Sequence, residues 1–260
     1  MRQHWRHFKA VRRSTVANYA ELKQINSQQV KLLPNNFTIL VWNIFKRANT
    51  HDFDKDIKKL IGRADLLCLQ EVLADEHPYL CDHSRALNYH YAVSYRREDK
   101  RFEGVMNATD FKLTEHAWSV KSIGREPLTK TAKTALISLI EMQGGQPLLL
   151  INIHMLLFKY KRLMQMEIEK VMRSCEDYDD FPAIFCGDFN TFTPWQLRFL
   201  DKLLNQKGFS RAKPKQRPKG KLYLDHIYTR GISAESVEIL DSIKSSDHYP
   251  LLCDLRLKGL

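Results

Sequence analysis

The segment Ile184-Phe185-Cys186-Gly187-Asp188-Phe189-Asn190 is an apolar run that ends in a carboxylate and a carboxamide two residues apart. In an extended backbone, side chains two residues apart point to the same side, so we expect Asp188 and Asn190 to project together from the end of a buried strand. Gly187 lets the chain turn or lets a ligand come close. The segment alone is equally consistent with a strand followed by an Asx turn, so the rest of the chain has to decide.

Working outward, the hydrophobic patterns predict strands that alternate in clusters with helices. No internal repeat and no regular βαβ repeat is visible, so we expect a two-sheet sandwich with helices on its outer faces. Strands are expected over residues 37–44, 64–69, 89–95, 104–113, 131–142, 146–155, 184–190, 222–228, 237–240 and 249–257. Helices are expected over residues 51–61, 76–87, 159–175 and 195–204, with partly helical structure over 16–25.

The composition is that of a globular chain, with 260 residues, 43% hydrophobic and 27% charged. Its net charge of +11 favours polyanionic partners: nucleic acid, phosphate esters or an anionic membrane surface. Much of the excess lies in residues 1–36, a basic N-terminal extension, and in residues 207–221, which hold seven Lys or Arg and no acidic residue. Each segment is either a solvated loop or a contact to a phosphate backbone. We expect residues 37–260 to form a single domain.

The five cysteines are an odd number, widely spaced and without a CxxC pair. They therefore indicate small core residues in a reducing compartment. No signal peptide is visible, and no apolar run approaches the ~18 residues of a membrane span. We expect a soluble, cytoplasmic monomer.

Six short motifs follow one another along residues 37–257, and together they resemble those of the endonuclease/exonuclease/phosphatase superfamily, the deoxyribonuclease I-like proteins. They are Trp42-Asn43, Leu69-Gln70-Glu71, Asn152-Ile153-His154, Gly187-Asp188-Phe189-Asn190, Leu224-Asp225-His226-Ile227 and Ser246-Asp247-His248. Each motif is weak by itself, whereas six in order are specific. In detail the chain resembles most closely a poorly characterised bacterial group of this superfamily, for which no substrate is agreed. The resemblance implies a four-layer α/β/β/α sandwich, with two mixed β-sheets flanked by helices and the site in a cleft at the top of the sheets.

The resemblance also implies metal-assisted hydrolysis of phosphodiesters or phosphomonoesters. Glu71 would be the principal metal ligand, with Asn43 and Asp247 beside it. Oxygen ligands of this kind suit Mg²⁺, with Mn²⁺ as an alternative.

Four further residues would handle the proton and the phosphate by the same resemblance. Asp225 would accept a hydrogen bond from His248 and fix its tautomer, which supports His248 as the group that activates water or contacts phosphate. Asp188 would position the nucleophile or stabilise the leaving group, and Asn190 would hold a phosphoryl oxygen. The formal base remains open between Asp188 and the Asp225–His248 pair.

His154 would place an imidazolium against the phosphate. Glu103 is the candidate for the second carboxylate that nucleases of the deoxyribonuclease type pair with this histidine. Lys133 is either a further phosphate contact or a surface lysine. His226 should point away from the site, because it is adjacent to Asp225 in a strand.

Nucleic acid is the substrate that we expect first, with the basic segments as backbone contacts. The alternative keeps the catalytic core but acts as a phosphatase or phospholipase-type phosphodiesterase on inositol phosphates or sphingolipids. A third interpretation is a non-catalytic module that binds phosphate or nucleic acid.

Overall fold

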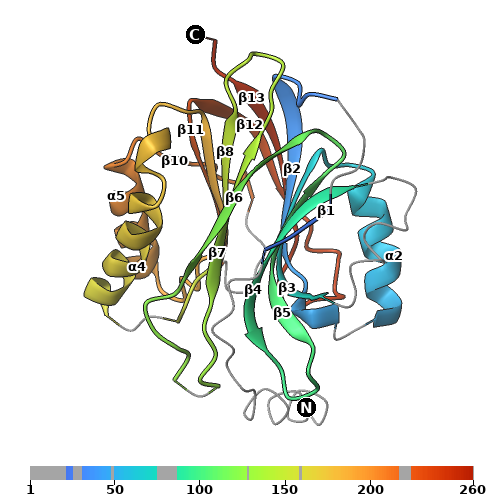
Figure 1. Cartoon of the computed structure of the whole chain (residues 1–260), viewed down its shortest axis with the longest axis vertical. Coiled ribbons are helices and arrows are strands. Elements are labelled where there is room, and N and C mark those ends of the chain that lie inside the picture. The colour runs from blue at the N-terminus through green and yellow to red at the C-terminus, as the bar shows by residue number, and fades with distance from the viewer. Residues whose placement is uncertain are drawn as a thin grey trace.

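The computed structural model of the chain describes residues 22–25, 31–47, 50–74, 87–127, 129–157, 160–216 and 224–259. Within these ranges two β-sheets pack face to face, and helices cover their outer faces (Figure 1). Both sheets are mixed, because each contains one parallel pair of strands among antiparallel ones. The four-layer α/β/β/α sandwich expected from the sequence is therefore confirmed.

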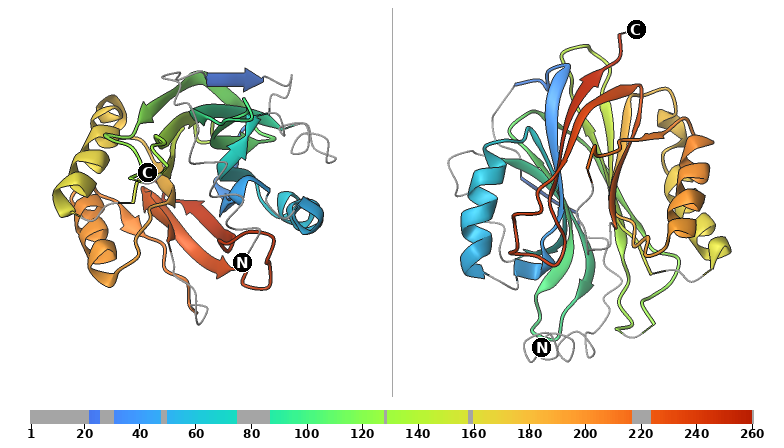
Figure 2. Two further views of the ribbon diagram at one scale, coloured as in Figure 1. Left: turned by 90° about the horizontal axis from the view of Figure 1, so that it is seen from below. Right: turned by 180° about the vertical axis from the view of Figure 1, so that it is seen from behind.

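The described strands of the first sheet lie in the order β1 (Leu22–Ile25), β4 (Asn88–Arg96), β5 (Phe102–Thr109), β3 (Leu66–Leu73), β2 (Asn36–Asn43), β13 (Leu251–Leu257) and β12 (Ile232–Ile239). Those of the second lie in the order β10 (Ser210–Arg211), β11 (Asp225–Arg230), β9 (Ala183–Asp188), β8 (Leu148–His154), β7 (Thr134–Ile140) and β6 (Leu113–Lys121). The helices are α2 (Thr50–Ile61), α4 (Lys161–Arg173) and α5 (Pro194–Asn205), with the short 3₁₀ helices η1 (Phe45–Arg47) and η3 (Glu176–Tyr178). Figure 2 shows α2 on one outer face and α4 with α5 on the other.

Three apolar layers hold these elements together. Phe53 of α2 stacks on Trp42 of β2, with ring centroids 5.2 Å apart, in the layer under α2. A second layer fills the space between the sheets and includes Val41 and Cys186. The third lies under α4 and α5, where Ile168 packs in the same cluster as the strand residues of β8 and β9. Burial of apolar surface on both faces of each sheet explains why the central strands read as continuous hydrophobic runs.

The two parallel pairs decide where a site can form. The chain passes from β2 through α2 to the neighbouring parallel strand β3, and from β8 through α4 to the neighbouring parallel strand β9. In open α/β sheets, ligands bind outside the carboxyl ends of parallel strands. Asn43 and His154 are the last residues of β2 and β8. Both strands end in the lower half of Figure 1.

Gly187 is required by packing inside the second sheet rather than by a ligand. Its φ is +129°, and a Cβ added there would lie 2.0 Å from the carbonyl oxygen of Ile153 on the adjacent strand. A few residues later, Thr193 and Gln196 form a capping box at the start of α5, with Pro194 in the first turn.

Three expected elements differ from the observed ones. Strand β3 continues past Glu71 instead of ending before it, with a β-bulge between Gln70 and Val72. The single strand expected over 104–113 is two strands in different sheets, because Thr109 Oγ1 accepts the N–H of Phe111 and turns the chain. Residues Leu22–Ile25 form an edge strand paired with β4, where helix was expected.

Parts of other expectations lie outside the described residues. They include the helix over 76–87 except Leu87, the helical stretch before Leu22, and Cys81. Residues 1–21 and 26–30 of the basic extension, residues 217–221 of the second basic segment and residues 222–223 of the strand expected over 222–228 also lie outside the described ranges. The other four cysteines are buried and unpaired. In the described ranges, no helix is both long enough and apolar enough to cross a membrane.

Candidate active site

A cleft of about 560 Å³ opens at the carboxyl ends of the parallel strands, and both sheets contribute to it. It is lined by Asn43, Glu71, Glu126, Lys133, His154, Leu157, Asp188, Asn190, Phe192, Leu224, Asp247 and His248. Seven of the eight residues that the sequence predicts for the site are therefore in one cleft. The eighth, Asp225, contacts His248 through a hydrogen bond.

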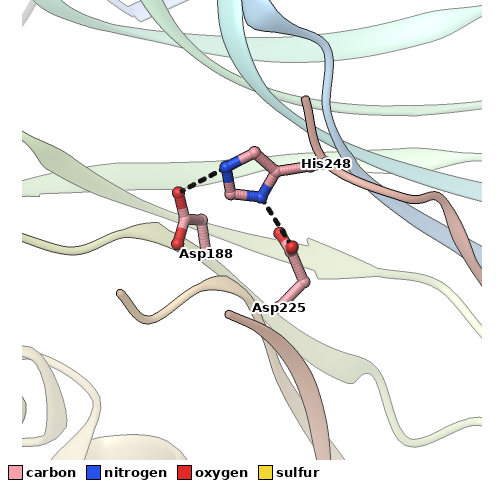
Figure 3. Close-up of side chains that lie close together, drawn as sticks. All are labelled: Asp188, Asp225 and His248. Atoms are coloured by element: carbon pink, nitrogen blue, oxygen red, sulfur yellow. Dashed lines mark hydrogen bonds and ion pairs between the residues drawn. The ribbon is translucent and has the colours of Figure 1, made fainter. Parts of the chain in front are cut away.

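Asp225, His248 and Asp188 form a line of alternating charges (Figure 3). His248 Nδ1 lies 2.7 Å from Asp225 Oδ2, and His248 Nε2 lies 3.8 Å from Asp188 Oδ2. Burial alone would lower the pKa of His248, but the negative charges of Asp225 and Asp188 raise this pKa to about 10. His248 is thus an imidazolium at neutral pH, which suits a contact to phosphate better than the acceptance of a proton from water.

Asp188 is the acceptor on which the other groups converge. Asn43 Nδ2 donates to Asp188 Oδ2 at 3.1 Å, and the backbone N–H of Asn190 donates to Asp188 Oδ1 at 2.9 Å. Burial raises the pKa of Asp188 to about 6, although the charge of His248 opposes the rise. A carboxylate whose pKa lies close to neutrality has the proton affinity that a general base needs.

Asn190 fits both interpretations of its segment, the Asx turn and the polar side chain that projects into a site. Its φ of 51° and its N–H bond to Asp188 make an Asx-type turn. Its side chain nevertheless lines the cleft, where its Nδ2 donates to the carbonyl oxygen of Met155 at 2.6 Å. The turn is what brings both side chains to the site.

His154 differs from the expected imidazolium. Its side chain is buried, with Nε2 3.5 Å from Asp188 Oδ2. Burial, reinforced by the positive charge of Lys133, lowers the pKa of His154 well below its usual value. The neutral imidazole is therefore the form at neutral pH.

Glu103 takes part in a buried network that is connected to Glu71 through Lys46. It accepts a short hydrogen bond from Tyr95 Oη, and its Oε2 lies 3.4 Å from Lys46 Nζ and 3.8 Å from a guanidinium nitrogen of Arg97. Burial raises the pKa of Glu103, against the charge of Lys46. The contacts of Glu103 among the described residues are thus with Tyr95, Lys46 and Arg97, and its pairing with His154 stays a prediction.

Lys46 lies beside the site although the sequence does not predict it there. Its buried ammonium forms an ion pair with Glu71 Oε2, while Lys133 Nζ lies 3.9 Å from Glu71 Oε1. Burial would raise the pKa of Glu71, but these two positive charges hold it well below its usual range. Lys133 thus faces the cleft, whereas Lys46 carried no signal beyond its position just after Asn43.

The backbone around this ion pair is unusual. Glu71, Phe45 and Lys46 have φ values of 56°, 48° and 54°, in the left-handed region that non-glycine residues rarely adopt. Such conformations cost about 1–3 kcal/mol each and cluster at functional sites. At Glu71 the strain coincides with the bulge in β3, which redirects the carboxylate.

Glu71, Asp247 and Asn43 offer a donor set that fits a divalent cation. Burial and the nearby negative charge of Glu71 raise the pKa of Asp247, and a divalent cation between the two carboxylates would relieve that repulsion. Asn43 Oδ1 accepts the N–H of Phe45 at 3.1 Å, which holds the carboxamide in place. Lys46 competes with any cation for Glu71.

Asp188, Asp225 and His248 form a second geometric candidate for a metal among the described residues. One ligand atom from each lies within 4.8 Å of the others. His248 is less suited to a cation, because its raised pKa keeps the imidazole protonated. His226 contributes nothing here, since its Nε2 lies 2.7 Å from Thr191 Oγ1 in the interior.

Comparisons with known proteins agree with this architecture. No protein-family model matches the chain. A "UPF0294 protein" of Vibrio campbellii is 26% identical over 245 residues, which cover 90% of this chain and 82% of that protein. Among solved structures, an endonuclease/exonuclease/phosphatase family protein from Leptotrichia buccalis superposes with a TM-score of 0.69 at 16% identity, over 86% of this chain and 100% of that one. ANGEL2, described as a 2′,3′-cyclic phosphatase, gives 0.67 at 16% identity, over 92% and 98%.

Proposed function

We propose that this chain, which has the fold of the endonuclease/exonuclease/phosphatase proteins, is a divalent-metal-dependent phosphoesterase that acts on phosphodiester bonds of nucleic acid. The observation that carries the proposal is the line of Asp225, His248 and Asp188 at the base of the cleft. It offers a positive charge for a phosphoryl oxygen beside a carboxylate that can take a proton from water.

The side chains divide the work between them. Asp188 accepts the proton of the attacking water as the water oxygen bonds to phosphorus, and Asn43 holds the carboxylate through its bond to Oδ2. The ester P–O bond breaks, and the leaving oxygen takes a proton from solvent. His248, oriented by Asp225, donates from Nε2 to a phosphoryl oxygen and stabilises the charge that develops there. His154, as a neutral imidazole, donates a further hydrogen bond to the phosphate.

Glu71 and Asp247 would hold the metal ion, with Asn43 beside them. Mg²⁺, or Mn²⁺ in its place, would supply neutralisation of charge on the phosphate when bound. Lys133, 3.9 Å from Glu71, adds a fixed positive charge on the same side of the cleft. The positive charges of the ion and Lys133 together favour an anionic substrate, either a dianionic phosphomonoester or a monoanionic phosphodiester, over a neutral one.

Hydrolysis of bis(p-nitrophenyl) phosphate with Mg²⁺ or Mn²⁺ tests the catalytic proposal. Asp188→Ala and His248→Ala should each lower kcat by on the order of 10² or more, as expected for loss of a base or a charge stabiliser. His116→Ala is the matched control, because His116 is exposed on β6 and should leave the rate unchanged. Wild-type protein that is inert on every phosphate ester with both metals contradicts the proposal and favours a binding module.

The nucleic-acid substrate rests on the basic excess and has its own test. Removal of residues 213–221 should weaken binding of an oligonucleotide and reduce the slope of log K against log salt, because phosphate contacts are lost. Unchanged binding and turnover of oligonucleotides after this deletion contradict the charge argument, while leaving the catalytic proposal intact.

A phospholipid-type or inositol phosphate substrate is the second candidate, and one observation favours it. Leu157 and Phe192 line the cleft and are 39% and 36% exposed, so the entrance offers apolar surface beside the phosphate site. Turnover of phospholipids or phosphomonoesters in a panel where DNA and RNA are stable would support this candidate.

A further inference from the structure

The large hydrophobic side chains that are exposed in the described part of the chain occur in two segments only. They are Leu157, Tyr160, Leu163, Met166 and Phe192. Leu157 and Tyr160 lie in the loop between β8 and α4, and Leu163 and Met166 lie in the first turns of α4. Phe192 lies in the loop between β9 and α5. Because β8 and β9 are adjacent parallel strands, both loops begin at the same end of the second sheet.

Packing of the core does not explain these exposed apolar side chains. On α4, Met164 and Ile168 face inward and are 2% exposed, while Leu163 and Met166 lie on the outer side at 39% and 43%. Tyr160, at 68%, directly precedes the helix. A helix that needs only its inner face for folding therefore also carries apolar residues on its outer face, near its beginning.

Positively charged side chains lie next to these apolar residues. Lys161, Arg162 and Arg198 are exposed at the starts of α4 and α5. Lys161 Nζ lies 5.8 Å and 5.6 Å from the ring centroids of Trp195 and Phe199, which ties the two helix starts together. Apolar side chains between cations are typical of a protein surface that lies in the interface of an anionic membrane.

The position of the surface links it to the cleft. The start of α4 lies at the end of the molecule where β2 and β8 terminate, as the views in Figure 1 and Figure 2 agree. Leu157 and Phe192 belong to both the cleft lining and the exposed apolar set. A membrane in contact with Leu163 and Met166 would therefore meet the entrance of the cleft.

We propose that the starts of α4 and α5, with Leu157, Tyr160, Leu163, Met166 and Phe192, form a docking surface for an anionic phospholipid membrane. Nucleic acid explains the surface less well. Tyr160 and Phe192 could stack on bases, but Leu157, Leu163 and Met166 offer no stacking face, and interfaces with nucleic acid are polar and cationic. The proposal does not depend on which phosphate ester the cleft hydrolyses.

Co-sedimentation of the full chain with vesicles tests the proposal. Wild-type protein should bind vesicles of phosphatidylglycerol and phosphatidylcholine at least tenfold more tightly than vesicles of phosphatidylcholine alone. Apolar insertion contributes to both, and the anionic headgroups add attraction to the lysine and arginine side chains. The double variant Leu163→Glu/Met166→Glu should lose at least tenfold in this binding. Both side chains are exposed, so the circular dichroism spectrum and the thermal midpoint should stay close to those of the wild type.

Lys58→Glu is the matched control. It changes the net charge by the same two units, but it lies on α2, which covers the other sheet. Its vesicle binding should stay within about twofold of the wild type. Hydrolysis of bis(p-nitrophenyl) phosphate in solution should be the same in all three proteins, which separates docking from catalysis.

Three results overturn the proposal. One is wild-type protein that does not bind anionic vesicles. Another is a loss of binding that is equal in Lys58→Glu and in the double variant, which would assign the effect to net charge alone. The third is a double variant that binds vesicles normally but loses affinity for an oligonucleotide, which would assign the surface to nucleic acid.

Discussion

Gln70 Nε2 of β3 donates a hydrogen bond of 2.7 Å to Asn152 Oδ1 of β8, and so joins the two sheets in the interior of the molecule. Asn152 Nδ2 in turn donates to the carbonyl oxygens of Leu69 and Met106 in the first sheet, at 3.2 Å and 3.0 Å. Gln70 precedes Glu71, and Asn152 lies two residues before His154. This polar link therefore fixes the two halves of the cleft against each other.

Asn152→Ala should destabilise the protein by roughly 3 kcal/mol, because it leaves buried polar groups of the first sheet without partners. The midpoint of urea unfolding measures the change. Asn205→Ala, at the exposed end of α5, should stay within about 0.5 kcal/mol of the wild type. An equal, small effect of both substitutions would mean that water replaces the bonds of Asn152.

Gly187→Ala should cost more than about 3 kcal/mol, since the added Cβ overlaps the Ile153 carbonyl and the backbone φ is unfavourable for alanine. Soluble expression and the thermal midpoint report the effect. Gly62→Ala is the control, as the nearest atom to its added Cβ is 3.8 Å away. A Gly187→Ala protein of normal stability would contradict the close packing of β8 on β9.

Lys46→Met should tighten Mn²⁺ binding roughly tenfold, which corresponds to about 1.4 kcal/mol. The reason is that a cation at Glu71 no longer has to compete with the ammonium group. Electron paramagnetic resonance of free Mn²⁺ gives the dissociation constant without any assay of activity. The exposed Lys55→Met serves as control. Weaker binding in Lys46→Met would instead show that Lys46 orients Glu71 for the metal.

Stability should fall as the pH drops from about 6.5 to 4, and His90 should be one of the groups responsible, together with His154. Burial lowers the pKa of His90 to about 4, opposed by a backbone hydrogen bond with Thr114. The unfolded chain takes up a proton near pH 6.5, whereas the folded chain resists it until about pH 4, so about 3 kcal/mol is lost across this window and nothing is lost above it.

Urea unfolding at pH 7 and pH 4.5 measures this loss. His90→Gln should reduce the difference between the two pH values, while the exposed His116→Gln should not. If His90→Gln leaves the pH dependence as it is in the wild type, other buried groups are responsible for it.

Particular residues show why the sequence predicted some features and not others. Asp188 and His154 were predictable because a polar residue at the end of an apolar run can be recognised in the sequence alone. Lys46 was not, because its partners Glu71 and Glu103 come from other strands and a lysine after a strand is usually exposed. The protonation of His248 and the neutrality of His154 depend on burial and neighbouring charges, which only the three-dimensional arrangement supplies.

Edge strands were the weak point of the fold prediction. Strand β6 ends its sheet and is only partly buried, so its sequence has no clear alternation to separate it from β5. Strand β1 has four residues and also lies at an edge. The hairpin of β7 and β8 was evident, in contrast, because both strands are central and are buried along their whole length.

The contacts of the cleft join residues far apart in the sequence, and this determines when the cleft can form during synthesis. The bond between Asn43 and Asp188 joins residues 145 positions apart, and the bond from Trp42 Nε1 to the carbonyl oxygen of His248 joins residues 206 apart. A ribosome-bound chain can thus form the β7–β8 hairpin early, yet it has no complete site until residues 246–257 have emerged. Residues 246–257 therefore have to leave the ribosome before the two halves of the cleft can be joined.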